Sequence, residues 1–117
     1  MKLGALYRNG HCVVPRTWLA DTAWSRLCGL LGRPPLRPDA EEALLLSPCG
    51  AVHTIGMRYA LDIVFLDRIG RVLDCHAALS PGRMRHCRGA RLTLELSAGS
   101  LARLRPQRGE EFRWKAT

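Results

Sequence analysis

Four polar residues gather in one short stretch of the chain, namely His53, Thr54, Arg58 and Asp62. A histidine, an arginine and an acid near one strand end can bind an anionic or sugar-like ligand through charge-assisted hydrogen bonds. The same groups can instead form a structural network in which Asp62 accepts from backbone donors and from Arg58. Gly56 between them permits a close approach of the backbone. Both interpretations stay open at the level of sequence.

Asp62 interrupts an apolar strand expected over residues 61–66, where it shares a face with Val64 and Leu66. A carboxylate in such a position costs free energy unless it accepts hydrogen bonds. We therefore expect Asp62 to be at least half buried and hydrogen-bonded. Asp and Gly at the two ends of residues 67–70 predict a hairpin turn directly after this strand.

The candidate ligand-binding residues lie in this stretch and in a basic segment further along: His53, Thr54, Met57, Arg58, Asp62 and Arg83. They predict a non-enzymatic binding module for a small polar or anionic ligand, or for an acidic segment of a partner protein. The alternative is a small hydrolase or transferase in which His53 and Asp62 form an acid–base pair. An enzyme of that kind needs both side chains in one open cleft.

The segment 83–91 holds four arginines in nine residues, the densest positive cluster of a chain whose formal net charge is +8. Arginine suits phosphate recognition, so a nucleic-acid-associated protein is a further alternative. No aromatic residue lies between Phe65 and Phe112 to stack on bases. We therefore expect any nucleic-acid binding to be weak, independent of base sequence and sensitive to salt.

The five cysteines are odd in number and scattered beside apolar runs. This usage is typical of reduced thiols in a cytoplasmic protein rather than of a disulfide framework. Cys49 and His53 have a spacing that two metal ligands or a catalytic pair could use, but the paired short spacings of a structural zinc site are missing. We expect free thiols, no metal and no cofactor. We also expect no signal peptide, and no apolar run approaches the ~20 residues of a membrane span.

Turn and cap residues mark the expected boundaries of elements in the first third of the chain. Asn9-Gly10 favours a type I′ hairpin, whose second strand is expected to end at Pro15. Asp21 or Thr22 is expected to cap a short helix over residues 23–28. The packed face of this helix is expected to hold Trp24, Leu27, Cys28 and Leu31.

Short strands dominate the remainder. They are expected over residues 42–46, 51–54, 71–77, 91–96 and 109–114, with an irregular basic stretch over 84–91 and one helical turn after Ser100. In the strand 91–96, the alternation of Leu92, Leu94 and Leu96 predicts one buried face. The pattern predicts a single domain of mostly β class, a small barrel or sandwich of about eight short strands with one short helix.

Three motifs occur in a fixed order: Arg26-x-x-Gly29-Leu30-x-Gly32-Arg33, then His53-Thr54-x-Gly56-Met57-Arg58-x-x-Leu61-Asp62, then Leu94-Glu95-x-x-Ala98-Gly99. Together they resemble the domain of unknown function 192 family over roughly residues 19–112. The resemblance implies a small, mostly β domain found in bacteria and archaea, with no established biochemical activity. The chain departs from many members, which show Trp-Met-x-Asn-Thr at positions 53–57, Pro at position 60 and an export signal.

Overall fold

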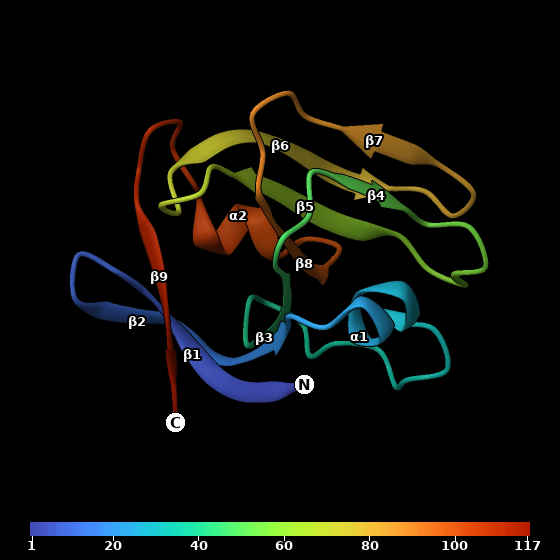
Figure 1. Cartoon of the computed structure of the whole chain (residues 1–117), viewed down its shortest axis with the longest axis horizontal. Coiled ribbons are helices and arrows are strands. Elements are labelled where there is room, and N and C mark those ends of the chain that lie inside the picture. Colours follow the sequence, from blue (N-terminus) through green and yellow to red (C-terminus); the bar gives the residue numbers. More distant parts are fainter.

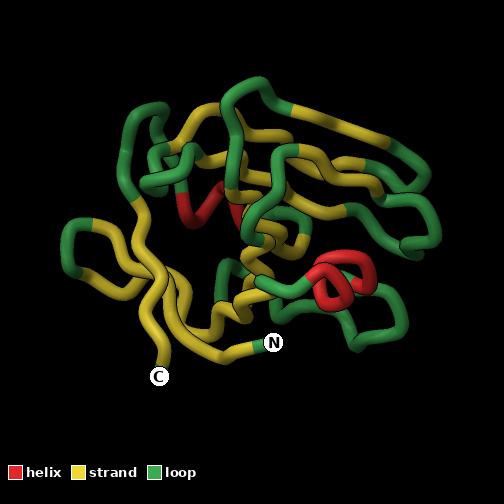
Figure 2. The backbone as a smooth tube through the Cα atoms, in the orientation of Figure 1, coloured by secondary structure: helices red, strands yellow, loops and turns green.

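The computed structural model describes residues 1–117, apart from the side chain of Leu27. Within that described chain, nine strands and two short helices alternate with loops (Figures 1 and 2). The elements are β1 (Lys2–Arg8), β2 (His11–Ala20), α1 (Ala23–Cys28), β3 (Glu42–Leu46), β4 (Ala51–His53), β5 (Leu61–Leu66), β6 (Val72–Leu79), β7 (Met84–His86), β8 (Leu92–Ser97), α2 (Ser100–Leu104) and β9 (Phe112–Ala116). The predicted mostly β class is confirmed, with one more strand and one more helix than expected.

Seven strands form one mixed sheet in the order β6-β5-β8-β3-β2-β1-β9, and β4 pairs with β7 in a separate ribbon. All neighbours in the large sheet run antiparallel except β2 and β3, which are parallel. Parallel neighbours need a long crossover connection, and here that connection carries α1. The ribbon of β4 and β7 lies beside β5 and β6 in Figure 1.

The sheet curls until its two edge strands approach each other at one end. An isolated bridge joins Arg71 to Glu111, just before β6 and β9 begin. The N–H of Phe112 donates to the carbonyl of Gly70 at 2.9 Å. Gly70 has a φ of +95°, and a Cβ there would collide with the Phe112 carbonyl oxygen. Along the described backbone the pairing stops at this bridge, so the sheet bends strongly without becoming a closed barrel.

Local signals in the sequence explain several element boundaries. Asn9 and Gly10 have φ values of 52° and 77°, which confirms the type I′ geometry predicted for the first hairpin. Thr22 caps α1, where its hydroxyl accepts from the N–H of Ser25 at 3.0 Å in a capping box. The Asp67 carboxylate accepts from two N–H groups of the turn that follows β5.

Several boundaries differ from the predictions, and three differences have a clear physical reason. Pro15 does not end β2, because it lies at a shift of the β1–β2 register between Val14 and Thr17, where a missing N–H is tolerated. Part of the stretch predicted to be irregular forms β7, whose exposed residues pair with β4. The last strand begins at Phe112, later than residue 109, because Gly109 and Glu110 instead bond to Val72.

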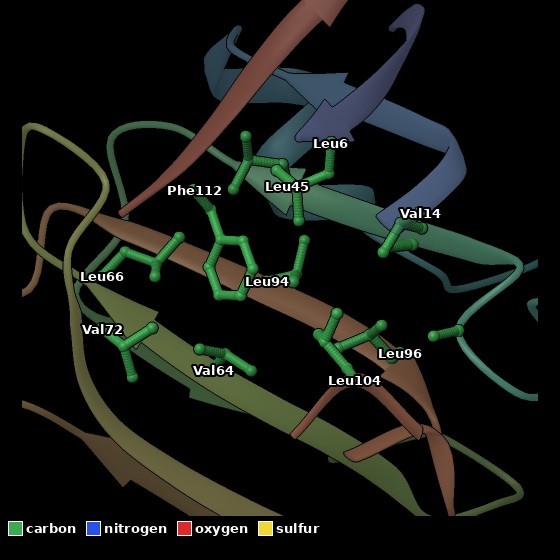
Figure 3. Packing of buried hydrophobic residues seen from close by; sticks show 12 residues of the cluster. Leu6, Val14, Leu45, Val64, Leu66, Val72, Leu94, Leu96, Leu104 and Phe112 are labelled. Atoms are coloured by element: carbon green, nitrogen blue, oxygen red, sulfur yellow. The ribbon is translucent and has the colours of Figure 1, made fainter. Parts of the chain in front are cut away.

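The large sheet is buried on both faces. One face packs with α2 around a cluster that includes Leu94, Leu96, Leu104 and Phe112 (Figure 3). The other face packs beneath α1 and β4 around Phe65 and its aliphatic neighbours. The predicted burial of Leu94 and Leu96 is confirmed, but the side chains that alternate with them are buried too. This double burial places polar residues of central strands inside the molecule.

Candidate functional site

Asp62 is fully buried on the α2 face of β5, which confirms its predicted burial. Its Oδ1 accepts from the Ala78 N–H at 2.7 Å, and its Oδ2 accepts from the Leu101 N–H at 2.8 Å. Ala78 has a φ of +49° at a register shift of β6, and Leu101 lies in the first turn of α2. Both donors lack a regular ladder or helix partner. Asp62 therefore joins a strand irregularity to a helix start, with backbone donors rather than Arg58 as its partners.

Thr54 is also fully buried and ties the loop after β4 to the turn before β7. Its hydroxyl donates to the Ser80 carbonyl at 2.6 Å and accepts from the Arg83 N–H at 2.9 Å. Its own N–H donates to the Arg83 carbonyl at 2.8 Å. Thr54 is thus occupied by the protein itself, and it positions neighbours that line the pocket described below.

We expect Thr54→Val to lower the free energy of unfolding by about 1–3 kcal/mol, because the isosteric side chain removes the buried hydroxyl that links the Ser80 carbonyl to the Arg83 N–H. Thr54→Ser keeps the hydroxyl and is the matched control, with a smaller loss. Urea denaturation monitored by tryptophan fluorescence measures both variants. Equal stability of Thr54→Val and the wild type would contradict this assignment.

A pocket of about 370 Å³ lies between α1, β4 and the face of the large sheet opposite α2. Its volume falls in the range of small-molecule sites. The walls are mainly aliphatic, and the groups that line it come from five separate segments. They include Arg26, Cys28, Leu30, Leu31, Leu46, Cys49, Ala51, Val52, His53, Ile55, Met57, Leu61 and Glu95.

Glu95 supplies a carboxylate to the floor of this pocket. It lies at the centre of the sheet, opposite Ile63 of β5 on one side and Leu44 of β3 on the other. Its side chain is 6% exposed, and within the described residues no donor or cation pairs with it. Burial raises the pKa of Glu95 to about 7, so the carboxyl is partly protonated near neutral pH.

Tyr59 is a second polar group without a partner in the same region. Its hydroxyl oxygen is buried and makes no hydrogen bond among the described residues. Burial raises the pKa of Tyr59, and the charge of Glu95 raises it further. The hollow lined by Tyr59 shares Leu30, Leu31 and Met57 with the Glu95 pocket, so the two spaces adjoin.

The mouth of the pocket combines basic and apolar side chains. His53 is exposed on β4, and Arg26 is half-buried on α1. Leu31 and Ile55 also line the cavity and are 42% and 54% exposed. Trp24 is 73% exposed, so the helix face predicted to be packed is largely open, and the Leu27 side chain predicted on that face lies outside the described residues.

The structure divides the six predicted site residues among different surroundings. His53 and Met57 line the Glu95 pocket, and Arg58 is exposed in the adjoining hollow. Arg83 lies with Arg85 beside β6, in another open hollow. Asp62 lies on the opposite face of the sheet. The structure therefore does not bring His53 and Asp62 into one cleft.

Glu95, Tyr59 and Arg26 were not predicted as site residues. The one signal in the sequence was the presence of Glu95 and Arg26 in the motifs that carry the family resemblance. Burial of Glu95 depends on strands and a helix that are distant in the chain, so the alternation within β8 alone could not reveal it.

The cysteines are free thiols. Burial, together with the smaller effects of the charges of Asp74 and Asp62, raises the pKa of Cys75 to about 11. This thiol is therefore protonated at neutral pH. Among the described residues, no group of three or more His, Cys, Asp or Glu is placed to hold a metal ion. Neither helix in the described part of the chain is long and apolar enough to cross a membrane.

Fold and site together define a small β-rich protein with a pocket on one face of its large sheet. The chain belongs to the DUF192 family, described as uncharacterized ACR, COG1430, whose model matches residues 6–114. The fold is similar to a Novosphingobium aromaticivorans DSM 12444 protein of unknown function, with 25% identity over 96% of this chain and 84% of that one and a TM-score of 0.78. No curated protein matches the chain.

A second solved structure shows the same fold. It is a Sinorhizobium meliloti 1021 protein described as a candidate transcription regulator, with a TM-score of 0.78 and 20% identity over 97% of this chain and 92% of that one. At this level of identity the similarity shows the fold alone.

Proposed function

We propose that this protein is a non-enzymatic binding module that holds a small polar ligand in the pocket above Glu95. The observation that carries this proposal is the buried Glu95 carboxylate, which faces a cavity and has no donor among the described residues. Burying a carboxylate without a hydrogen bond costs free energy. A ligand that donates to Glu95 recovers part of that cost, which gives the residue a reason to be there.

The surroundings of Glu95 also favour a ligand of limited size with an apolar body. Leu46, Val52, Met57 and Leu61 provide aliphatic walls, whereas few polar groups point into the space. Such a combination is typical of pockets in which a few polar contacts orient a ligand that also has an apolar part. Met57 adds a side chain that adapts its shape to what it contacts.

Two earlier alternatives are less well supported by this geometry. A purely anionic ligand or an acidic segment would place its charge in the pocket of Glu95, where like charges repel. A hydrolase or transferase with a His53–Asp62 pair requires proton transfer between groups that lie on different sides of the sheet. The arginines of segment 83–91 stay available for weak contacts with phosphate, and that prediction is independent of the pocket.

A substitution that places a larger side chain at the pocket tests the proposal. We expect polar fragments that bind the wild type in ligand-observed NMR to lose at least about tenfold in affinity when Ala51 is replaced by Phe. Ala51 is exposed on β4 and lines the cavity, so the larger side chain occupies the mouth without entering the core. Ala102→Phe on exposed α2 is the matched control and should retain binding. Fragments that bind all three proteins equally would show that the pocket is not the binding site.

A further inference from the structure

The charges around the Glu95 pocket differ between its floor and its mouth. The floor carries the Glu95 carboxylate, which is almost fully buried. The more exposed residues that line the same cavity include Arg26 and His53. A ligand that fits this distribution has a positive or donating end toward the floor and a negative end toward the mouth.

The Glu95 carboxylate at the floor of the pocket favours a ligand group that donates hydrogen bonds. A protonated amine offers three N–H donors and no acceptor, so it can satisfy the carboxylate of Glu95. A positive charge beside Glu95 also favours its ionised form in a region of low dielectric constant.

Arg26 is positioned to bind a negatively charged group of the ligand. Its Nη1 donates to the carbonyl oxygens of Asp21 at 3.1 Å and Ser47 at 3.3 Å, which anchors the guanidinium between the start of α1 and the end of β3. The remaining nitrogens make no hydrogen bond to the described residues. A guanidinium anchored on one edge can present its other N–H groups to a carboxylate without losing much side-chain entropy.

The space between the two ends is aliphatic. Leu30, Leu46 and Val52 are buried around the pocket, and Leu61 lies below it. A hydrocarbon side chain of moderate size buries its apolar surface there, which favours binding. A ligand with charged groups at both ends and no apolar part would make no hydrophobic contact with these walls.

From this arrangement we infer that the ligand is a zwitterion with an apolar side chain, that is, a hydrophobic α-amino acid or a close analogue. Its ammonium group lies against Glu95, its side chain contacts the aliphatic walls, and its carboxylate faces Arg26 and His53. This inference rests on the proposed function and adds the chemical class of the ligand to it.

Compounds that share one hydrocarbon part test each end separately. Leucine carries both charges, isopentylamine lacks the carboxylate, and isocaproate lacks the amine. Phenylalanine, phenethylamine and hydrocinnamate form a second, larger set. Calorimetric titration of the full-length protein at neutral pH should show each amino acid binding at least about tenfold more tightly than either of its truncated analogues.

Two variants assign the ends to residues. Glu95→Gln should weaken binding of leucine and isopentylamine by about tenfold or more and leave isocaproate nearly unchanged. Arg26→Gln keeps an N–H₂ group for the anchoring carbonyls but removes the charge, so it should weaken leucine and isocaproate while sparing isopentylamine. Circular dichroism of each variant confirms that the fold persists before affinities are compared.

Different failures have different meanings. If isocaproate binds as tightly as leucine, or if Glu95→Gln binds leucine as well as the wild type does, the zwitterion inference is wrong although the pocket still binds. If none of the six compounds binds at millimolar concentration, the inference is equally overturned. The proposed function then stands or falls on the separate comparison of Ala51→Phe with Ala102→Phe.

Discussion

Replacement of Asp62 by alanine should lower the free energy of unfolding by about 1–3 kcal/mol, because two backbone N–H groups lose an acceptor that is fully buried. The two orphaned donors would be the N–H of Ala78, at the left-handed residue of β6, and the N–H of Leu101, in the first turn of α2. The substitution therefore removes a hydrogen bond from β6 and another from α2. Urea denaturation at neutral pH measures it.

Asp67→Ala is the matched control. The Asp67 carboxylate also accepts from two backbone N–H groups, those of Ile69 and Arg71, but these bonds are exposed at a hairpin turn. Water can replace the lost acceptor there, so we expect a loss of about 1 kcal/mol or less. If Asp62→Ala is as stable as Asp67→Ala, Asp62 does not hold the two elements together as described.

Replacement of Glu95 by glutamine should have the opposite effect and make the ligand-free protein more stable at pH 8. Burial raises the pKa of Glu95 from 4.5 to about 7 in the folded state. This difference corresponds to about 3 kcal/mol between the two protonation states. Glutamine is nearly isosteric and carries no charge, so it avoids the cost of burying an ionised group.

The direction of the pH dependence follows from the raised pKa. The folded state holds the Glu95 proton more tightly than the unfolded chain does, so the protonated acid carries no penalty below about pH 4.5. As the pH rises through about 7, the penalty grows to its full size. The stability advantage of Glu95→Gln over the wild type should therefore be small at pH 4.5 and about 3 kcal/mol at pH 8.

Comparing Glu95→Gln with the wild type at two pH values separates the contribution of Glu95 to stability from the contributions of its titratable and charged neighbours. The groups that share its pocket or act on it are Arg26 and Cys28 of α1, Cys49, His53 of β4 and Tyr59. All of them are present in both proteins, so their contributions largely cancel in the difference. Glu41→Gln, at an exposed acid before β3, is the control for loss of one negative charge. An advantage for Glu95→Gln that is the same at both pH values would contradict the prediction.

The two experiments distinguish two buried carboxylates on neighbouring strands. Asp62 has both oxygens satisfied by the protein, so its removal destabilises the fold. Glu95 has no donor in the described structure, so its neutralisation stabilises the empty fold and, on our proposal, weakens ligand binding. A residue that improves stability when it is changed but impairs binding is characteristic of a functional site.

The β class and several local elements could be predicted because their interactions are local, whereas the strand order, the parallel pair and the separate ribbon could not. The Asn9-Gly10 hairpin, the Thr22 cap and the Asp67 turn each depend on a few consecutive residues. Burial of Asp62 was predictable as well, since it stands inside a continuous apolar strand. The predicted end of β2 at Pro15 failed because the residues that tolerate a proline there belong to an irregular pairing with β1.

Most of the candidate site could not be predicted, because it is assembled from distant segments. Leu94, Glu95 and Leu96 read as alternating core and surface positions of a half-exposed strand. Glu95 becomes buried only because β8 lies between β5 and β3, beneath α1 and β4. No pattern within β8 reports which elements cover its second face. His53, predicted at a strand end, and Met57, predicted in the loop that follows, are among the residues that line the pocket.

The single parallel pair in the sheet, β2 with β3, has a consequence for how this family can diversify. The crossover between these strands spans residues 21–41 and supplies α1, Leu30 and Leu31 to one side of the pocket. It begins and ends on the sheet but adds no strand to it. On our proposal, changes at exposed residues of this excursion that line the pocket, such as Leu31, would alter ligand preference while the strand order is retained. Leu36 and Ala40 of the same excursion are buried in the two core clusters and fix it to the sheet.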